Sequence, residues 1–189
     1  MKKGLLIVLS GPSGVGKGTI YHRLLEIIPG LTVSVSVTTR APRVGEINGV
    51  HYYFVTEAEF ERMRDAGELL EWAETVHNHY GTPKKYVYEK LSAGNDVLLE
   101  IDVKGAKQIK AASPDCVTIF VLPPSEEELR RRLTGRGTET PEQMSARLEL
   151  AKEEIAQRDR FDYDVVNDDL ERAVGEIVGI IEREKAKRR

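Results

Sequence analysis

The sequence predicts an α/β fold in which helices cover both faces of a parallel sheet. Residues 4–10, 97–103, 116–122 and 163–167 form short runs that are apolar on both faces and do not alternate, as expected for parallel strands buried between helices. Helical patterns separate these runs, so the connections are expected to be right-handed crossovers. A fifth run, residues 32–40, alternates Val with Ser and Thr and predicts a strand with one polar face. The 189 residues suffice for one domain with a sizeable core.

Capping residues mark three predicted helix starts. Thr56 with Glu59, and Ser125 with Glu128, form capping boxes. Residues 140–143 form a third start, with Pro at the first helical position. Apolar stripes at helical spacing follow a glycine-rich loop, this third start and the last strand. They comprise Ile20, Leu24, Ile27 and Ile28; Met144, Leu148, Ala151 and Ile155; and Leu170, Val174, Ile177, Val178 and Ile181.

Composition narrows the classes of partner. The net charge of −3 gives no global basic field for nucleic acid. The single cysteine, Cys116, allows no intramolecular disulfide and favours a reducing compartment. The apolar run near the N-terminus is too short for a signal peptide, and no segment approaches the length of a membrane span. We therefore expect a cytoplasmic protein that binds neither membrane nor nucleic acid, and no obligate protein partner is indicated.

The stretch SGPSGVGKGT, residues 10–19, follows the first apolar run and predicts a phosphate-binding loop. Free backbone N–H groups and the helix dipole favour an anion between a strand and a helix start, and a lysine adds charge. A turn of small residues is the alternative, but the G-x-x-x-x-G-K pattern disfavours it. Gly18 stands where Ser or Thr is usual. The loop comprises Gly11, Pro12, Ser13, Gly14, Val15, Gly16, Lys17, Gly18 and Thr19.

Residues 36–54, SVTTRAPRVGEINGVHYYF, suggest a second phosphate site. Arg40 and Arg43 flank a proline, and a guanidinium fork suits a phosphate monoester. The hydroxyl of Tyr52 adds a donor. A solvated loop with incidental arginines is the alternative for any one of these residues taken alone.

With these segments in place, nearly the whole chain, about residues 4–183, resembles the guanylate kinases. The resemblance is carried by GPSGVGKGT, SVTTRAPRVGE, GVHYYF, EWA, YGT, LLEIDVKG, GRGTET and VNDD, in the family's order. It implies a P-loop nucleoside monophosphate kinase fold with a five-stranded parallel sheet core. It also implies transfer of the ATP γ-phosphoryl group to GMP or dGMP with Mg²⁺, as part of purine nucleotide metabolism. The implied core covers residues 1–35, 85–133 and 150–189, with a GMP-binding insert at 36–84 and a lid at 134–149.

The resemblance also implies an acceptor site. Arg40, Arg43, Tyr52 and Tyr80 match residues that hold the GMP phosphate, and Ser36, Glu71 and Thr82 match those that read guanine. The chemistry agrees, because a carboxylate accepts both the N1–H and N2–H₂ donors of guanine, which adenine lacks. By itself Glu71 is more simply a surface carboxylate.

The remaining matched residues are acidic groups, lid arginines and a strand-end turn. Glu100 and Asp102, two apart at the end of an apolar strand, are predicted to share a face, to hold Mg²⁺ through water and to contact GMP. Arg136 and Arg147 match lid arginines that clamp the transferred phosphoryl group, Arg147 from the GMP side. On the ATP side the resemblance implies Arg132, Arg136, Asn167 and Asp168, although a simple Asn-Asp turn is a strong rival for the last two. Together with Lys17, Arg40 and Arg43, the lid arginines form the predicted catalytic set.

Two other functions are compatible with parts of the sequence. Domains that resemble guanylate kinases also serve as protein-binding scaffold modules, but those would be expected to have lost Lys17, the lid arginines or the loop glycines. A P-loop kinase for another small phosphate is the nearer alternative, and Ser36, Glu71 and Thr82 argue against it.

Overall fold

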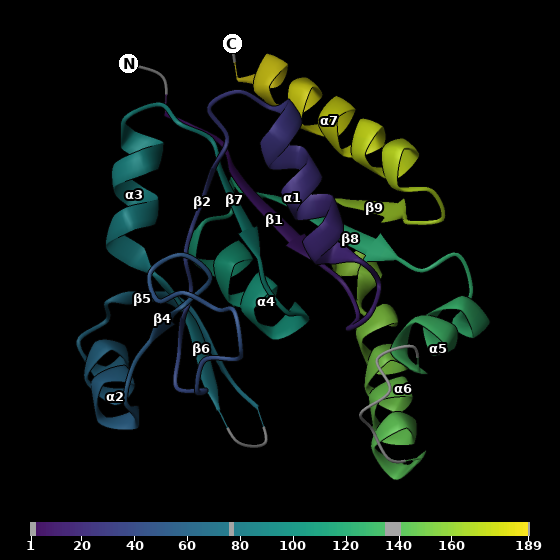
Figure 1. Cartoon of the computed structure of the whole chain (residues 1–189). Helices are drawn as coiled ribbons and strands as arrows, with labels where there is room; N and C mark the ends of the chain where they lie inside the picture. Colours follow the sequence, from purple (N-terminus) through teal and green to yellow (C-terminus); the bar gives the residue numbers. More distant parts are fainter. Residues whose placement is uncertain (1–2, 76–77, 135–140, 189) are drawn as a thin grey trace. The chain divides into compact units, whose positions relative to one another are not determined.

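The computed structural model describes residues 3–75, 78–134 and 141–188, and Figure 1 shows the course of the chain. The chain forms two compact units. The first unit consists of Met1–Leu6, Thr32–Leu99 and Lys104–Cys116, and the second unit of Ile7–Leu31, Glu100–Val103 and Val117–Arg189.

The elements alternate between strands and helices along much of the chain (Figure 1). The strands are β1 (Leu6–Ser10), β2 (Thr32–Val33), β3 (Val37–Thr38), β4 (Tyr53–Phe54), β5 (Leu69–Glu74), β6 (His79–Pro83), β7 (Val97–Glu100), β8 (Val117–Leu122) and β9 (Tyr163–Val166). The α-helices are α1 (Lys17–Ile27), α2 (Glu57–Asp65), α3 (Lys84–Ser92), α4 (Val103–Ala112), α5 (Glu126–Thr134), α6 (Pro141–Ile155) and α7 (Leu170–Lys187), and a 3₁₀ turn spans Arg158–Arg160.

A five-stranded parallel sheet in the order β2-β7-β1-β8-β9 confirms the predicted fold class. Every residue of β1 and of β8 is buried, which explains why both strands are apolar except for Ser10 and Thr118. Ile7 pairs with Val117 and Ser10 with Phe120, so β1 and β8 pair in parallel without a shift in register. The chain leaves β1 directly into the glycine-rich loop, which therefore lies at the carboxyl end of a buried strand.

Two predicted strands differ from the structure. Residues 32–40 form two short strands instead of one, with β2 paired to β7 and β3 paired to β4 and β6. The alternation of Val with Ser and Thr indicates extended chain but not which partner strand it meets. The run 97–103 ends as a strand at Glu100, because α4 begins at Val103. Asp102 therefore lies in the connection, and the prediction that Glu100 and Asp102 share a strand face is wrong.

A four-stranded sheet in the first unit, in the order β4-β3-β6-β5, lies within the segment expected to be an insert. The sequence did not predict this sheet, because its strands are short and rich in polar residues. Its core is the cluster of Val37, Phe60 and Leu69, to which α2 contributes Phe60. Strand β3 pairs with β4 in parallel and with β6 in antiparallel orientation, and this mixed pairing gathers distant segments of the chain.

The predicted helix starts are confirmed where the structure describes them. Thr56 Oγ1 accepts the Glu59 N–H at 3.2 Å, and Ser125 Oγ accepts the Glu128 N–H at 3.1 Å. Helix α6 begins at Pro141 as expected, while Thr140 lies outside the described residues. The apolar stripe of α6 packs on α5 through Leu148 and its neighbours in the cluster.

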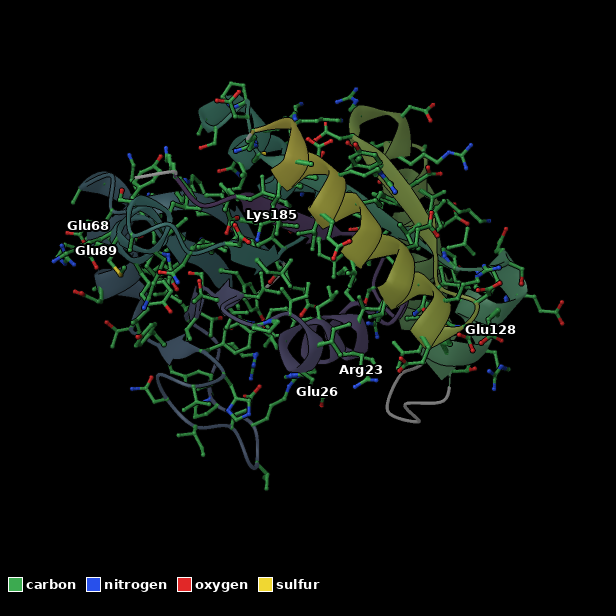
Figure 2. All side chains as sticks on the ribbon, turned by 90° about the horizontal axis from the view of Figure 1, so that it is seen from above. Arg23, Glu26, Glu68, Glu89, Glu128 and Lys185 are labelled. Carbon is green, nitrogen blue, oxygen red and sulfur yellow. The ribbon has the colours of Figure 1, made fainter. Side chains whose placement is uncertain are left out.

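Helices α1 and α7 pack together in the second unit. The α7 stripe buries Val174, Ile177 and Ile181 as predicted. Arg23 of α1 joins the two helices through an ion pair with Glu171 at 2.9 Å. It also pairs with Glu26 at 2.8 Å, and Figure 2 labels these two residues of α1. Such exposed pairs contribute little, so the apolar stripe carries the contact.

Candidate active site

The phosphate loop between β1 and α1 requires glycine for two distinct reasons. Gly11 and Gly16 have φ angles of 143° and 98°, in the region that favours glycine. A methyl group at Gly11 would lie 2.4 Å from the Val121 carbonyl oxygen, and one at Gly16 would lie 2.5 Å from Asn167 Nδ2. The loop backbone is therefore seated directly against β8 and against the residue that follows β9.

Lys17 opens α1 and crosses back over the loop. Its Nζ donates to the carbonyl oxygens of Gly11 and Pro12 at 2.5 and 3.1 Å. Burial lowers the pKa of the Lys17 ammonium, and nearby carboxylates, Glu100 first among them, oppose that shift. The group is thus a cation held among loop carbonyls and ready to transfer its hydrogen bonds to phosphate oxygens.

Glu100 ends β7 on the same side as Gly18. The carboxyl group reaches solvent, yet the protein atoms around it desolvate it and raise its pKa, while Lys17 opposes this rise. A methyl group at Gly18 would meet only the Glu100 carboxylate oxygens, at 3.9 and 4.0 Å. The missing side chain at Gly18 therefore leaves open space in front of this carboxylate. Thr19, one residue later, is exposed on the first turn of α1.

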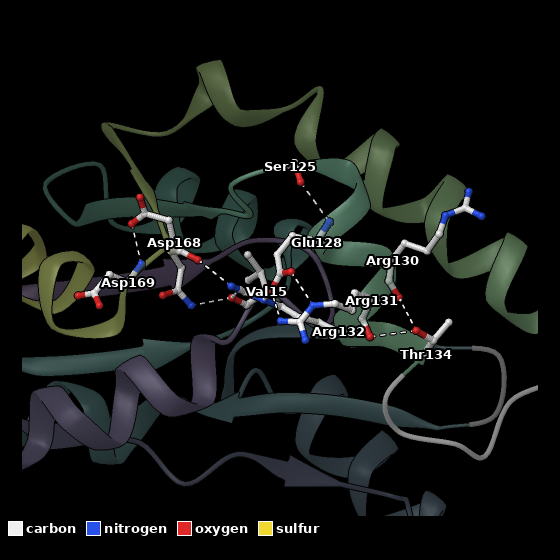
Figure 3. A network of polar contacts seen from close by, with 10 residues as sticks. Val15, Ser125, Glu128, Arg130, Arg131, Arg132, Thr134, Asp168 and Asp169 are labelled. Atoms are coloured by element: carbon white, nitrogen blue, oxygen red, sulfur yellow. Dashed lines mark hydrogen bonds and ion pairs between the residues drawn. The ribbon is translucent and has the colours of Figure 1, made fainter.

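Arg132 and Asn167 both donate to the carbonyl oxygen of Val15 in the loop, and Figure 3 shows Arg132 beside Val15. Arg132 donates to the carbonyl oxygens of Val15 and Asn167 at 3.1 and 3.0 Å, and its Nε donates to Glu128 at 2.8 Å. The buried Asn167 side chain donates to the same Val15 oxygen at 2.8 Å. Both residues were predicted on the ATP side, and the structure brings them to the phosphate loop.

The other predicted ATP-side and lid residues have different surroundings. Asp168 pairs with Arg172 at 2.5 Å. It also accepts the Asp169 N–H at 2.6 Å (Figure 3). Arg147 of α6 donates to Ser13 Oγ at 2.6 Å and so reaches the tip of the loop. Arg136 lies outside the described residues.

Replacing Asn167 with alanine should loosen the phosphate loop. The Val15 carbonyl oxygen loses one of its two donors and keeps Arg132, so the change costs about 0.5–1.5 kcal/mol of unfolding free energy. We expect a lower melting temperature and weaker ATP binding, measured by thermal denaturation with and without nucleotide.

The matched control is Asp164→Ala, at an exposed position of β9. It should leave both quantities close to those of the unmodified chain. An Asn167→Ala protein that melts and binds ATP like this control would show that the amide does not support the loop.

The four-stranded sheet brings the predicted acceptor residues together in the first unit. In the β3–β6 pair, Thr38 lies opposite Tyr80, and in the β5–β6 pair Glu71 lies opposite Thr82. Ser36 comes just before β3, and its carbonyl oxygen accepts the Tyr53 N–H at 2.8 Å. Segments far apart in sequence thus meet on neighbouring strands.

Arg40 forms the centre of an aromatic and acidic cluster. Its guanidinium lies 5.4 Å from the centroid of the Tyr52 ring, and the Tyr52 and Tyr80 rings are 6.0 Å apart. Both terminal nitrogens of Arg40 donate to Glu46, at 2.9 and 3.0 Å, and the Arg43 N–H donates to the same carboxylate at 2.6 Å. Arg40 is therefore held in place, while Arg43 is exposed.

Glu46 is the member of this cluster to which the sequence assigned no role. Pairing with Arg40 holds the pKa of the Glu46 carboxyl at about 2. The sequence does place an acidic residue near the arginines, because Glu46 follows Arg43 by three residues within the glycine-containing turn. Charge spacing in a loop, however, does not reveal which arginine the carboxylate pairs with.

Glu71 and Thr82 form a buried polar pair. Glu71 is 5% exposed and Thr82 is fully buried, and the Thr82 hydroxyl donates to a Glu71 carboxylate oxygen at 2.6 Å. A buried carboxylate is costly to desolvate unless ligands or neighbours donate to it. The arrangement therefore fits a ligand that presents N–H donors, and the structure excludes the simpler interpretation of Glu71 as a surface carboxylate.

This chain is similar in sequence and in structure to known guanylate kinases. The sequence profile described as guanylate kinase matches residues 3–184. The guanylate kinase of Symbiobacterium thermophilum is 54% identical over 185 residues, covering 98% of this chain and 88% of its own. That of Carboxydothermus hydrogenoformans is 51% identical over 187 residues, covering 99% and 92%. A crystal structure of guanylate kinase from Anaplasma phagocytophilum superimposes with a TM-score of 0.81 at 40% identity, covering 97% of this chain and 87% of its own.

The parallel sheet with a glycine-rich phosphate loop after β1 defines a P-loop kinase. A gluconokinase from Sinorhizobium meliloti shares this fold at 18% identity, with a TM-score of 0.53. Within that class, the chain belongs to the guanylate kinase family. Of the helices that the structure describes, none is both long and apolar enough to cross a membrane.

Proposed function

We propose that this protein is a guanylate kinase that transfers the γ-phosphoryl group of ATP to GMP or dGMP, giving ADP and the nucleoside diphosphate. The observation that carries the choice of acceptor is the buried Glu71–Thr82 pair, in the same unit as the Arg40 cluster. Such an enzyme draws on the nucleotide pools of the cytoplasm, and we place it there.

On the donor side, the loop N–H groups and Lys17 bind the β- and γ-phosphates of ATP. Lys17 exchanges its contacts with the Gly11 and Pro12 carbonyls for phosphate oxygens. Arg147, which donates to Ser13 Oγ, would clamp the transferred phosphoryl group from the GMP side and neutralise its charge. We assign the same role to Arg136, which lies outside the described residues.

On the acceptor side, Arg40, Arg43, Tyr52 and Tyr80 bind the phosphate of GMP. Glu71 accepts hydrogen bonds from the N1–H and N2–H₂ groups of guanine, while the hydroxyls of Thr82 and Ser36 form hydrogen bonds with the base. Adenine lacks the N1–H and N2–H₂ donors, so AMP would not form the hydrogen bonds to Glu71 that GMP forms, which is the basis for its rejection. An ionised oxygen of the GMP phosphate attacks the γ-phosphorus in line, so no general base is needed.

The chain offers acidic oxygens that fit Mg²⁺, which prefers one or two carboxylates together with water and substrate phosphates. Glu100 faces the open space at Gly18, and Asp102 follows it closely in the chain. Among the described residues there is no group of three or more His, Cys, Asp or Glu that could enclose a metal on its own. Glu100 and Asp102 would thus hold the ion through water, and Mg²⁺ would neutralise the donor phosphates.

An ADP-release assay with a panel of nucleoside monophosphates tests this function. We expect turnover with GMP and dGMP, and far less with AMP, CMP and UMP. Turnover of another small phosphate would identify a different P-loop kinase. No ADP release with any nucleoside monophosphate of the panel would favour a protein-binding scaffold.

Glu46→Ala should weaken GMP binding about tenfold, since the carboxylate that fixes both Arg40 and the Arg43 backbone is lost. Isothermal titration with GMP measures the effect, and ATP affinity should not change. Glu61→Ala, at an exposed position of α2, is the control. Unchanged GMP affinity in Glu46→Ala would contradict the positioning of the arginines by Glu46.

The pH dependence of this contact follows from the depressed pKa. A carboxyl group whose pKa falls to about 2 on folding stabilises the folded state at every pH above the ordinary pKa range of glutamate. That contribution is lost progressively as the pH falls from the ordinary pKa range of glutamate through about 2. Glu46 is therefore ionised throughout the pH range in which kinase activity is assayed.

A further inference from the structure

Strand β5 carries Glu71 at the edge of the four-stranded sheet, where it has only β6 as a neighbour. In an antiparallel pair, the backbone groups of successive residues point alternately toward the partner strand and away from it. Trp72 follows Glu71, and its N–H and C=O bond to a side chain outside the sheet. The backbone next to the base-reading carboxylate therefore lies on the side of β5 that no strand covers.

Gln108 of α4 supplies the missing partner. Its Oε1 accepts the Trp72 N–H at 3.1 Å, and its Nε2 donates to the Trp72 carbonyl oxygen at 2.6 Å. A carboxamide presents one acceptor and two donors in a plane, so it can satisfy both backbone groups of one residue as a neighbouring strand would. Both residues belong to the first unit.

This support comes where the sheet pairing is least regular. The β5–β6 register shifts between Leu69 and Glu71, so the ladder is interrupted immediately before Glu71. After the shift, Glu71 lies opposite Thr82 and Trp72 opposite Gly81. Regular pairing thus secures Glu71 on one side only, and the Gln108 amide secures the next residue from the other edge.

We propose that Gln108 is a positioning residue for guanine recognition, acting through the Trp72 backbone on the carboxylate of Glu71. The inference rests on the proposed base-reading role of Glu71. A carboxylate that discriminates between bases must keep its oxygens aligned with two N–H donors to within a fraction of an ångström. Gln108 provides that alignment by restraining the strand on which Glu71 lies, without touching the base.

The test compares Gln108→Ala with Lys107→Ala, the exposed neighbour on the same helix. Steady-state assays at saturating co-substrate give kcat and the KM for GMP, ATP and AMP, and thermal denaturation gives the melting temperature. Loss of the two hydrogen bonds should raise the KM for GMP about tenfold and lower the preference for GMP over AMP. The KM for ATP, and kcat with saturating GMP, should stay close to the values of Lys107→Ala.

A second variant, Gln108→Leu, keeps the bulk of the side chain and serves if the alanine protein does not fold. Glu71→Ala, assayed in parallel, separates the two proposals. If Glu71→Ala loses base selection while both Gln108 variants match Lys107→Ala, the positioning role is wrong and the base-reading role stands. If Glu71→Ala retains base selection, both are wrong. An equal loss for GMP and ATP in the Gln108 variants would indicate general destabilisation and would also overturn the inference.

Discussion

Lys17→Ala is expected to reduce the turnover number for phosphoryl transfer by at least about 10³-fold, because it removes the fixed positive charge at the β- and γ-phosphates. In the structure this ammonium lies among loop carbonyls and near the carboxylate of Glu100. Its removal also takes away the cation that opposes the raised pKa of Glu100. The effect therefore combines lost stabilisation of the phosphates with a carboxyl group that retains its proton more readily.

Turnover at saturating ATP and GMP measures this loss, and circular dichroism confirms that the variant is folded. Lys3→Ala, which removes an exposed lysine of the first unit, is the matched control and should behave like the unmodified chain. Activity retained in a folded Lys17→Ala protein would overturn the assignment of the phosphate loop.

Glu71→Ala is expected to lower kcat/KM for GMP by about 10³- to 10⁴-fold while leaving the KM for ATP nearly unchanged. The carboxylate is buried and bonded to the Thr82 hydroxyl, so alanine removes the acceptor of both guanine donors and leaves that hydroxyl without its partner. AMP does not offer the two guanine donors to this carboxylate even in the unmodified protein, so the turnover of AMP should fall much less. Selectivity between the two nucleotides should therefore collapse.

The measurement is the ratio of kcat/KM for GMP to that for AMP. Glu74→Ala, an exposed acidic residue on the same strand, is the matched control and should preserve the ratio. An equal loss for GMP and AMP in Glu71→Ala would show that the carboxylate stabilises the fold of the site without reading the base.

The elements that the sequence predicted well are those with local signals. Buried parallel strands are apolar on both faces, so β1 and β8 were predicted to within one or two residues. The side chains of Thr56 and Ser125 cap their helices as expected. The phosphate loop was predictable because its backbone conformation favours glycine. These features depend on neighbours in sequence and need no knowledge of the tertiary fold.

The four-stranded sheet was not predictable in the same way. Its strands are as short as two residues, and their pairing joins segments separated by long stretches of chain. The burial of Glu71 follows from that pairing, since β5 and β6 bring Thr82 to it. The side-chain contacts of Glu46 and Gln108 likewise depend on tertiary packing. Family resemblance pointed to the acceptor residues, but only the fold shows what surrounds them.

The anchoring of the phosphate loop has a consequence for the thermodynamics of nucleotide binding. Gly11 rests against β8, Asn167 holds the Val15 carbonyl and Lys17 closes over the loop, all before ATP arrives. The conformational entropy of ordering this loop is lost when the chain folds, so ATP binding need not lose it again. Calorimetry should therefore find a smaller entropic penalty for ATP than for GMP, whose phosphate is met by the exposed Arg43.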